Sequence, residues 1–190
     1  MNSKIEVHIE GFTDVVGDED LGLLILANDK NDRQISLPCE QDMLREFVRR
    51  MHHEDGNEHR LPEVLGGILQ RDTLGHYEVV INALKDGKYS ALIVNEDTLD
   101  LAPVRATDAV LFAYVAHLKI FVESTLWLHQ SAPFSEQDSK TGRLGIPINV
   151  LSDDLLRKAL DDAIRREDYE AASHIRDEIN QRKKNKPEKS

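Results

Sequence analysis

The sequence has one cysteine, Cys39, and no run of eighteen apolar residues. One cysteine cannot form an internal disulfide, and a membrane-spanning helix needs about 20 consecutive apolar residues. The polar N-terminus, Met-Asn-Ser-Lys, also lacks the pattern of a signal peptide. These absences predict a protein of the cytoplasm, without a disulfide framework and without membrane contact.

Positive charge is scarce in the first 150 residues. The chain carries 35 acidic and 24 basic residues, a formal net charge of -11, and from Leu151 onward the two signs are equal at ten each. The acidic excess therefore lies before Leu151, where it repels phosphate and argues against broad binding of duplex DNA. Any contact with nucleic acid must be local. The basic run at 182–186 is typical of a solvated chain end.

A glycine-rich phosphate loop between a strand and a helix is also absent, which argues against a doubly wound nucleotide-binding fold. The sequence does contain a series of segments in which apolar residues recur at the spacing of a strand or of a helix. Ile5, Val7 and Ile9 alternate with polar residues, the period of a half-buried strand. Strands are expected near 5–9, 23–27, 34–37, 77–84, 88–94 and 119–122, and helices near 43–51 and 62–69. The first three strands should form an antiparallel meander that Pro38 and Cys39 end, and the strand at 119–122 should be the last.

A further helix is expected to begin at Thr107. Its hydroxyl could cap the first turn, and Asp108 suits the positive end of the helix. Its apolar residues should bury it against a sheet; they are Val110, Leu111, Tyr114, Val115 and Leu118. The whole order indicates an α+β fold, with a mixed, largely antiparallel sheet packed with helices and a C-terminal helical hairpin.

The last forty residues predict two short amphipathic helices turned back on each other. Apolar residues recur there at spacings of three and four: Leu156, Leu160 and Ala163 in the first helix, and Tyr169, Ala172, Ile175 and Ile179 in the second. Asp168 should cap the second helix. Because isolated helices below about 12 to 15 residues are marginal in water, this hairpin should pack on its own chain or on a partner.

Within this hairpin, the segment DYEAASHIRDEI resembles the UVR motif (UvrB/UvrC motif), which is an interaction hairpin. The matching positions are Tyr169, Glu170, Ala171, Ala172, Ile175, Arg176 and Asp177. The resemblance implies a protein partner bound through Tyr169, Glu170, Ala172, Ile175, Arg176 and Asp177. The alternative is a generic charged helical hairpin, because alternating charges are common on solvated helix faces.

The segments VVINALKDGKYSALIV and VRATDAVLFAYVAHLKIFV are similar to the bifunctional nuclease (BFN) domain, over roughly residues 5–132. The matching positions are Asp86, Gly87, Tyr89, Ala91, Arg105, Thr107, Asp108 and Ala109. Ala106 stands where the family usually has proline. Residues 37–40 depart from its Ile-Gly step before a Glu-Ala pair, and residues 60–63 lack its Thr-His-Asp. If those residues support catalysis, this chain has lost part of it.

The two resemblances divide the chain into a BFN-like α+β domain at 1–132, a linker at 133–151, a UVR-like hairpin at 152–184 and a basic tail at 185–190. They imply a nuclease that hydrolyses DNA or RNA phosphodiester bonds, with Mg²⁺ or Mn²⁺ as candidate cofactors. The catalytic candidates are Asp108, Arg105 and Thr107, since such chemistry needs an activated water and a cation for the developing charge. The alternative for Arg105 and Asp108 is a surface ion pair at a helix start.

Two other groups of residues carry less chemistry. The cluster of His52, His53, Glu54, Asp55, Glu58 and His59 has no metalloprotease-type spacing, and flexible exposed ligands rarely hold a metal in a preformed site. Cys39 is expected to be a core or edge thiol.

The competing function is a non-enzymatic adaptor or stress-response regulator, whose hairpin recruits a protein partner. A homodimer or higher oligomer is expected, because a large apolar helix beside an incomplete sheet suggests that subunits cover each other.

Overall fold

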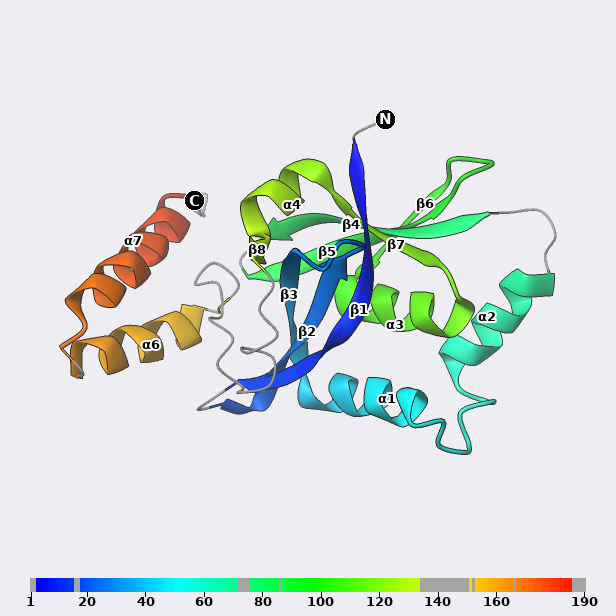
Figure 1. Ribbon diagram of the computed structural model, residues 1–190, viewed down its shortest axis with the longest axis horizontal. Helices are drawn as coiled ribbons and strands as arrows, with labels where there is room; N and C mark the ends of the chain where they lie inside the picture. Colours follow the sequence, from blue (N-terminus) through cyan, green and yellow to red (C-terminus); the bar gives the residue numbers. More distant parts are fainter. Residues whose placement is uncertain are drawn as a thin grey trace, which may run out of the picture. The chain divides into compact units, whose positions relative to one another are not determined.

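The computed structural model describes residues 3–15, 18–71, 76–85, 87–133, 151, 153–165 and 167–185 (Figure 1). The chain divides into two compact units. The larger comprises residues 1–84 and 89–144, and the smaller comprises residues 145–190 together with 85–88. Within the described ranges, no helix combines the length and the apolar character that a membrane crossing requires.

Three consecutive strands form the antiparallel meander that the alternating apolar pattern predicts. They are β1 (Lys4–Val15), β2 (Asp18–Asn28) and β3 (Arg33–Glu40). β2 lies between the other two, with Val7 opposite Asn28 and Leu24 opposite Leu37. The register shifts by one residue between Ile9 and Gly11, so β1 contains a bulge there.

The expectation that Pro38 and Cys39 end the third strand is wrong. Pro38 lies opposite Leu23 and Cys39 lies opposite Gly22, so β3 runs on to Glu40. Proline is tolerated in a strand where its missing N–H would not be paired. On its other side, among the described residues, β3 pairs through Arg33 and Gln34, and the part that contains Pro38 lies beyond that pairing.

The remaining strands complete one eight-stranded sheet. They are β4 (Tyr77–Lys85), β5 (Lys88–Asn95), β6 (Leu101–Arg105), β7 (Lys119–Glu123) and β8 (Ala132–Pro133). The strand order is β6-β5-β4-β7-β1-β2-β3-β8. β4 and β7 are parallel, whereas β1 pairs antiparallel with both β2 and β7, and β5 with β6. Gly87, at φ +75°, makes the expected turn between β4 and β5. The predicted α+β class with a mixed, largely antiparallel sheet is confirmed.

The helices that the structure describes in the larger unit are α1 (Gln41–Met51), α2 (Leu61–Arg71), α3 (Ala106–Ala116) and α4 (Ser124–Gln130). α1 contacts β2 and β3, α3 contacts β3, β6 and β7, and α2 packs on α3. The pair Gly66 and Gly67 does not break α2. A Cβ added at Gly66 would lie 3.4 Å from the Cβ of Ala116, so glycine allows α2 to approach α3 closely.

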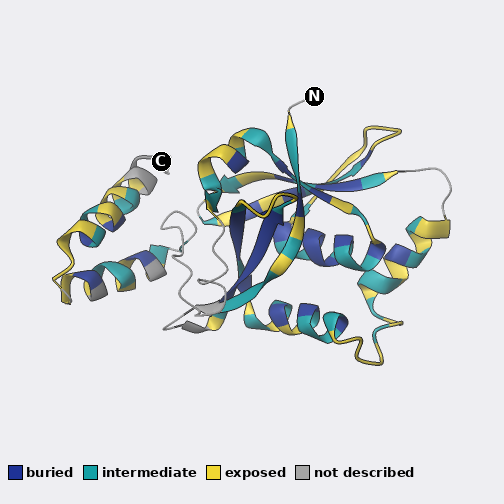
Figure 2. Cartoon of the chain, viewed as in Figure 1, coloured by how far each residue is buried: buried dark blue, intermediate teal, exposed yellow. Residues whose placement is uncertain are grey.

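The core lies mainly on the central strands and on α3, as the dark blue segments of Figure 2 show. Fully buried side chains include Leu24, Leu26, Leu37, Phe47, Val79, Ile81, Val110 and Val122. The face of α3 that the fold buries is lined largely by small residues, namely Ala106, Ala109, Ala113 and Ala116. Of the large apolar residues expected to bury this helix, Val110 and Leu111 are buried, whereas Tyr114 and Val115 are only half-buried and Leu118 lies beyond the helix.

Three elements were not predicted from the sequence. β6 and α4 fall outside the expected strands and helices. The expectation that the strand at 119–122 is the last is wrong, because β8 follows it. β8 also reaches the first residue of the expected linker, because Pro133 lies opposite Arg33. Residues 134–150 of that linker lie outside the described residues.

Candidate functional site

The N-terminus of α3 brings together the acid and the cation that the sequence proposed for catalysis. Arg105 ends β6 in an extended conformation and directly precedes the helix, and Asp108 lies in its first turn. Arg105 Nε donates to Asp108 Oδ2 at 2.6 Å, and Nη2 donates to Oδ1 at 3.3 Å. Both side chains reach solvent, with 67% and 34% of their surface exposed. The hydrogen bond to Asp108 raises the pKa of Arg105, which stays a cation.

Thr107 does not cap this helix. α3 begins at Ala106, its N-cap residue is Arg105, and no side chain makes a capping hydrogen bond there. The expectation that the Thr107 hydroxyl caps the first turn is therefore wrong. Thr107 is half-buried, and in the sequence it lies between Arg105 and Asp108. The helix start instead gains stabilisation from the negative charge of Asp108 near its positive end.

Two residues at the end of β3 belong to the same electrostatic environment. The pKa of the Cys39 thiol is raised to about 12, mainly by burial and also by the negative charges of Glu40 and Asp108, whereas Arg105 lowers it. β3 and α3 are in contact. Cys39 is buried and stays protonated at neutral pH, as the core thiol that the sequence predicted.

We call Glu40, Arg105 and Asp108 the α3 charge cluster. It places two carboxylates and one guanidinium near a solvent-exposed helix start. Sequence reasoning did not include Glu40 among the candidates, because 65 positions separate it from Arg105. The sequence signal that could have found it is its place beside Cys39, in the stretch compared with the Glu-Ala pair of the BFN domain.

A metal centre does not emerge from the histidine-rich segment. Among the described residues, no three His, Cys, Asp or Glu side chains gather in a way that could hold an ion. His52, His53, Glu54, Asp55, Glu58 and His59 are all exposed, in the turns that follow α1.

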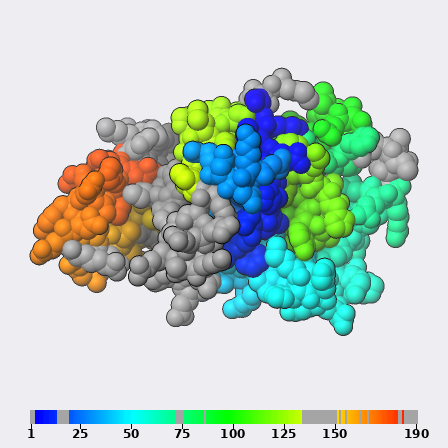
Figure 3. Space-filling view, viewed as in Figure 1, coloured from blue at the N-terminus to red at the C-terminus, as the bar shows by residue number. Residues whose placement is uncertain are grey.

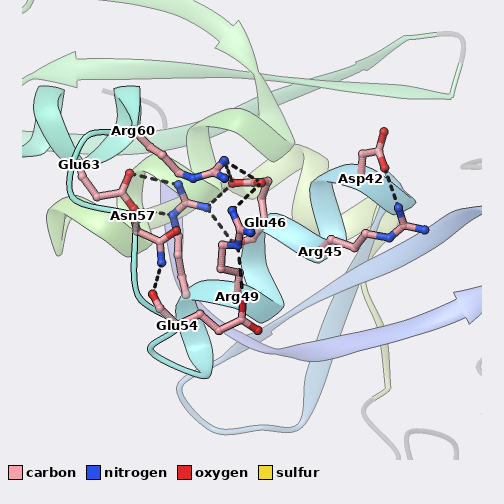
Figure 4. A network of polar contacts seen from close by, with 9 residues as sticks. Asp42, Arg45, Glu46, Arg49, Glu54, Asn57, Arg60 and Glu63 are labelled. Carbon is pink, nitrogen blue, oxygen red and sulfur yellow. Dashed lines mark hydrogen bonds and ion pairs between the residues drawn. The ribbon is translucent and has the colours of Figure 1, made fainter.

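A second charged network joins α1 to α2 (Figure 4). Its centre is Arg50, whose side chain is only 4% exposed. Arg50 Nε and Nη2 donate to the two carboxylate oxygens of Glu63 at 2.7 and 3.1 Å, and Nη1 donates to Glu46 Oε2 at 2.7 Å. Arg60 Nη1 adds two hydrogen bonds to Glu46 at 3.0 Å. A buried guanidinium is tolerated when carboxylates pair with it, so this network fixes α2 on α1.

Glu46 should make the free energy of unfolding depend on pH in the acidic range. The hydrogen bond from Arg50 is the largest cause that lowers its pKa from the ordinary value of 4.5. A carboxylate whose pKa is lower in the folded state than in the unfolded state stabilises the folded state at pH values above the unfolded pKa. This stabilisation disappears as the pH falls through the folded pKa. We expect the stability difference between wild type and Glu46→Gln to be full at pH 6 and to shrink below pH 4.5. Urea unfolding at pH 6, 4 and 3 measures this.

The matched control for that experiment is Asp42→Asn. Asp42 also lies on α1 and accepts from an arginine, Arg45 Nη1, at 3.1 Å, but its side chain is 91% exposed. Exposed pairs contribute about 0 to 1 kcal/mol, so this variant should track the wild type at every pH. An equal response of the two variants to acid would contradict a specific role for Glu46.

The C-terminal helices form a hairpin with its own core. They are α6 (Asp153–Arg165) and α7 (Tyr169–Asn185). Four residues are buried between them, and partly buried residues pack around those four. The buried residues are Leu156, Ala163, Ala172 and Ile175, and the partly buried ones are Leu151, Ala159, Leu160, Ala171 and Ile179. The predicted apolar spacings on both helices thus face each other within one hairpin.

The turn between α6 and α7 is specified by its backbone hydrogen bonds. The N–H of Asp168 donates to the carbonyl of Ala163 at 2.9 Å, and the N–H of Glu167 donates to that of Ile164 at 3.1 Å. This pair of bonds is the Schellman arrangement that ends a helix. Asp168 then accepts from the N–H of Ala171 at 3.0 Å, so the predicted cap of α7 is confirmed.

The Schellman turn carries a residue that is unfavourable for it. Glu167 adopts φ +59°, a left-handed conformation that glycine adopts without steric cost. We expect Glu167→Gly to stabilise the hairpin by about 0.5 to 1 kcal/mol. Native-state hydrogen exchange of α7 amides measures the change. Glu170→Gly, which introduces glycine inside the first turn of the same helix, should destabilise instead; stabilisation by both variants would exclude the turn conformation as the cause.

The hairpin coincides with a segment for which a comparison with known families gives a match. Residues 154–184 match the UvrB/uvrC (UVR) motif. A UVR motif is an interaction module for proteins or DNA. A comparison of the chain with curated proteins finds no match.

The structure divides the UVR residues that were proposed to bind a partner. Ala172 and Ile175 are buried in the hairpin core, so they hold α7 on α6 and are not available to a partner in the folded hairpin. The other four are exposed: Tyr169, Glu170, Arg176 and Asp177. The expectation that Tyr169 belongs to the apolar stripe between the helices is wrong, since 69% of its surface is exposed.

Proposed function

We propose that the protein is an adaptor that recruits a protein partner through the exposed residues of its UVR hairpin. The proposal rests on a division of the α7 residues into those that hold the hairpin together and those that stay exposed. Buried Ala172 and Ile175 close the hairpin, while Tyr169, Glu170, Arg176 and Asp177 stay exposed. Tyr169 and Arg176 are seven residues apart, as are Glu170 and Asp177, so each pair lies two turns apart on one side of the helix. We call these four residues the α7 outer row.

The composition of the α7 outer row suits a protein interface. Tyrosine and arginine are enriched among the residues that dominate the binding energy of protein interfaces. The buried residues that hold α7 on α6 do not include Tyr169, so this side chain is not needed for the hairpin core. Tyr169 is 69% exposed, so a partner can cover its ring without breaking contacts within the hairpin. Glu170 and Asp177 add charges that select a complementary surface.

The charge of the larger unit favours a protein over nucleic acid as the partner. The first 150 residues carry 25 acidic and 14 basic residues, and such a body repels phosphate. The hairpin segment is balanced in charge and offers no strong attraction to a phosphate backbone. We also propose the cytoplasm as the compartment, because a reducing environment suits a single buried free thiol, Cys39.

The adaptor proposal is tested with the full chain immobilised and exposed to an extract of its source cells. We expect one or a few proteins to be enriched and to be lost when Tyr169→Ala is combined with Arg176→Glu. Lys158→Ala, an exposed residue on α6, is the matched control and should capture the same proteins. Equal capture by the wild type, the Tyr169→Ala/Arg176→Glu double variant and Lys158→Ala would contradict the proposal.

The second candidate function is phosphodiester hydrolysis by the larger unit, as the resemblance to the BFN domain implies. The specific observation in its favour is the α3 charge cluster, in which Arg105 pairs with Asp108 near Glu40 at an exposed helix start. In this proposal a substrate phosphate takes the place of Asp108 on the Arg105 guanidinium, which neutralises the developing charge. The released Asp108 carboxylate orients the attacking water.

A divalent cation would suit the same cluster. Mg²⁺ is commonly held by one or two carboxylates, with waters and substrate phosphate completing the coordination. Glu40 and Asp108 are the carboxylates near this position, and Mg²⁺ or Mn²⁺ bound by them would polarise the phosphate or lower the pKa of a water.

Labelled single-stranded DNA and RNA, with and without Mg²⁺ or Mn²⁺, test this second candidate. Metal-stimulated cleavage should fall by about 100-fold or more in Asp108→Ala and Arg105→Ala. The matched control is Asp42→Ala with Arg45→Ala, an exposed Arg–Asp pair of the same three-residue spacing on α1. Cleavage that survives both α3 substitutions would remove the α3 charge cluster as the site, and absence of cleavage would leave the adaptor as the function.

A further inference from the structure

The loop that joins β5 to β6 exposes two leucines. Leu99 and Leu101 are 62% and 59% exposed, and the residues around them, 96–98 and 100, are exposed as well. We call residues 96–101 the leucine loop. Figure 3 shows the green segment that contains this loop at the molecular surface. Scattered exposed leucines are ordinary in soluble proteins, so exposure alone does not mark a binding surface.

The backbone of Leu99 has a conformation that leucine rarely adopts. Its φ is +61°, in the left-handed region where the Cβ of an L-residue lies too close to the following carbonyl oxygen. The other non-glycine residues of the described chain with positive φ are all polar: Asn31, His53, His117 and Glu167. Glycine or asparagine would form the same turn with less strain. A bulky apolar side chain that is both strained and exposed therefore indicates a role outside the fold.

Hydrogen bonds fix Leu99 in this conformation. Its N–H donates to the carbonyl of Asn95 at 2.9 Å, and the N–H of Asn95 donates to the carbonyl of Asp100 at 3.0 Å. Asn95 is buried, and its side-chain Oδ1 accepts from the N–H groups of Asp97 and Thr98 at 2.9 and 3.0 Å. An ordered loop thus presents the two leucines, which lowers the entropy that is lost when a partner binds.

The charges of the leucine loop are all negative. Glu96, Asp97 and Asp100 are exposed, and residues 95–104 include no lysine or arginine. The backbone N–H of His76 donates to Asp97 Oδ2 at 2.8 Å, and this hydrogen bond lowers the pKa of the Asp97 carboxyl, which stays ionised. The loop therefore attracts positive charge and repels phosphate and anionic lipid headgroups.

The edge of β6 is poorly suited to pairing with an added strand. β6 ends the sheet on this side in the strand order of the described residues. Asp100 accepts from the N–H of Asn95, so its carbonyl points toward β5. Backbone groups alternate in direction along an antiparallel strand, so those of Leu101 and Pro103 point away from β5. Pro103 has no N–H to donate there. A helical partner, which docks through its side chains, fits this site better than an extended one.

We propose that the leucine loop docks a basic amphipathic helix of another protein. The apolar side chains of that helix cover Leu99 and Leu101, and its lysine and arginine side chains lie against Glu96 and Asp100. The contact is small, so its dissociation constant is expected in the micromolar range. The proposal is independent of the α7 outer row and of chemistry at the α3 charge cluster, because it uses no residue of either.

Two synthetic peptide helices of about 18 residues test the chemistry of the partner. Both carry leucines along one face, and the other face carries lysines in the first peptide and glutamates in the second. Fluorescence anisotropy with the full chain, at about 150 mM salt, should show micromolar binding of the lysine peptide and none of the glutamate peptide. Binding of both peptides, or of neither, would overturn the proposal.

Substitutions locate the site of the lysine peptide. The double variant Leu99→Asn/Leu101→Asn should raise its dissociation constant by about 10-fold or more, and Glu96→Gln should raise it as well. The matched controls should leave it unchanged: they are Leu128→Asn, a leucine 73% exposed on α4, and Asp42→Asn, a carboxylate 91% exposed on α1. Wild-type affinity in the loop variants, or an equal loss in the controls, would place the peptide elsewhere on the acidic chain and would overturn the proposal.

Leu99→Gly separates a binding role from a structural one. Glycine adopts a φ of +61° without strain, so this variant should melt about 2 °C above the wild type while it loses affinity for the lysine peptide by about 10-fold. Differential scanning calorimetry measures the melting temperature. A lower melting temperature would show that Leu99 stabilises its own fold and would overturn the proposal. Self-association of the wild type without peptide, abolished by Leu99→Asn, would assign the loop to a second copy and would overturn it too.

Discussion

Replacing Arg50 by methionine is expected to lower the free energy of unfolding of the larger unit by about 3 kcal/mol. The Arg50 side chain is 4% exposed and donates to both Glu46 and Glu63. Methionine fills part of the space but leaves the Glu63 carboxylate, 18% exposed, without the cation it pairs with, and leaves Glu46 paired with Arg60 but without its hydrogen bond from Arg50. Removing one partner of a buried ion pair is costly for this reason. Urea unfolding followed by circular dichroism measures the loss.

A double variant distinguishes the unpaired charge from lost packing. Adding Glu63→Leu to Arg50→Met removes one abandoned carboxylate, and the double variant should regain a large part of the lost stability. Arg45→Met is the matched control, because Arg45 lies on the same helix with its side chain 77% exposed, and it should change stability by less than about 0.5 kcal/mol. A double variant less stable than Arg50→Met alone would show that Glu63 contributes independently of Arg50.

Replacing Leu156 by alanine is expected to unfold the C-terminal hairpin while the larger unit stays folded. Leu156 is fully buried, and truncating such a residue costs about 2 to 5 kcal/mol. A unit of this size has a total stability of roughly 2 to 5 kcal/mol. Among the residues whose burial the structure describes, the hairpin core contains four buried residues, so it has little stability to spare.

Hydrogen exchange resolved by segment measures this effect. In Leu156→Ala the amides of α6 and α7 should exchange at the rate of an unfolded chain, while those of β2 and β3 keep their protection. Ile164→Ala is the control, since Ile164 lies on the same helix but is 51% exposed. Retained protection of α7 in Leu156→Ala, or a parallel loss in β2, would contradict a hairpin that folds on its own core.

The regular strands and helices were predictable because each carries its own local pattern. β1 and β4 follow alternating or β-rich runs, and the turn between β4 and β5 needs the left-handed conformation that Gly87 supplies. The cap of α7 by Asp168 was predictable for the same reason, because the capping residue and its target lie three positions apart.

The unpredicted elements depend on contacts between distant residues. Four of the five residues of β6 are exposed, Pro103 among them, so its sequence carries no strand signal, and its pairing with β5 defines it. β8 has only two residues and exists through its pairing with Arg33 and Gln34. α4 is a helix of seven residues, below the length at which an apolar period can be recognised.

The candidate sites show the same division. Arg105 and Asp108 could be paired from the sequence, because residues three apart meet in the first turn of a helix. Glu40 could not be added, since only the fold brings the end of β3 near the start of α3. In the hairpin, periodicity selected the four core residues, but the same period also selected Tyr169, which begins α7 next to the turn and faces solvent.

Photo-crosslinking from position 169 tests most directly whether the α7 outer row is the docking surface. The full chain is made in its source cells with benzoylphenylalanine in place of Tyr169, which keeps an aromatic ring there, and in parallel in place of Lys158 on α6. Irradiation should give a discrete protein adduct from position 169 and none from position 158, and the adduct should disappear when Leu156→Ala unfolds the hairpin. No adduct from position 169, or the same adduct from both positions, would contradict the assignment.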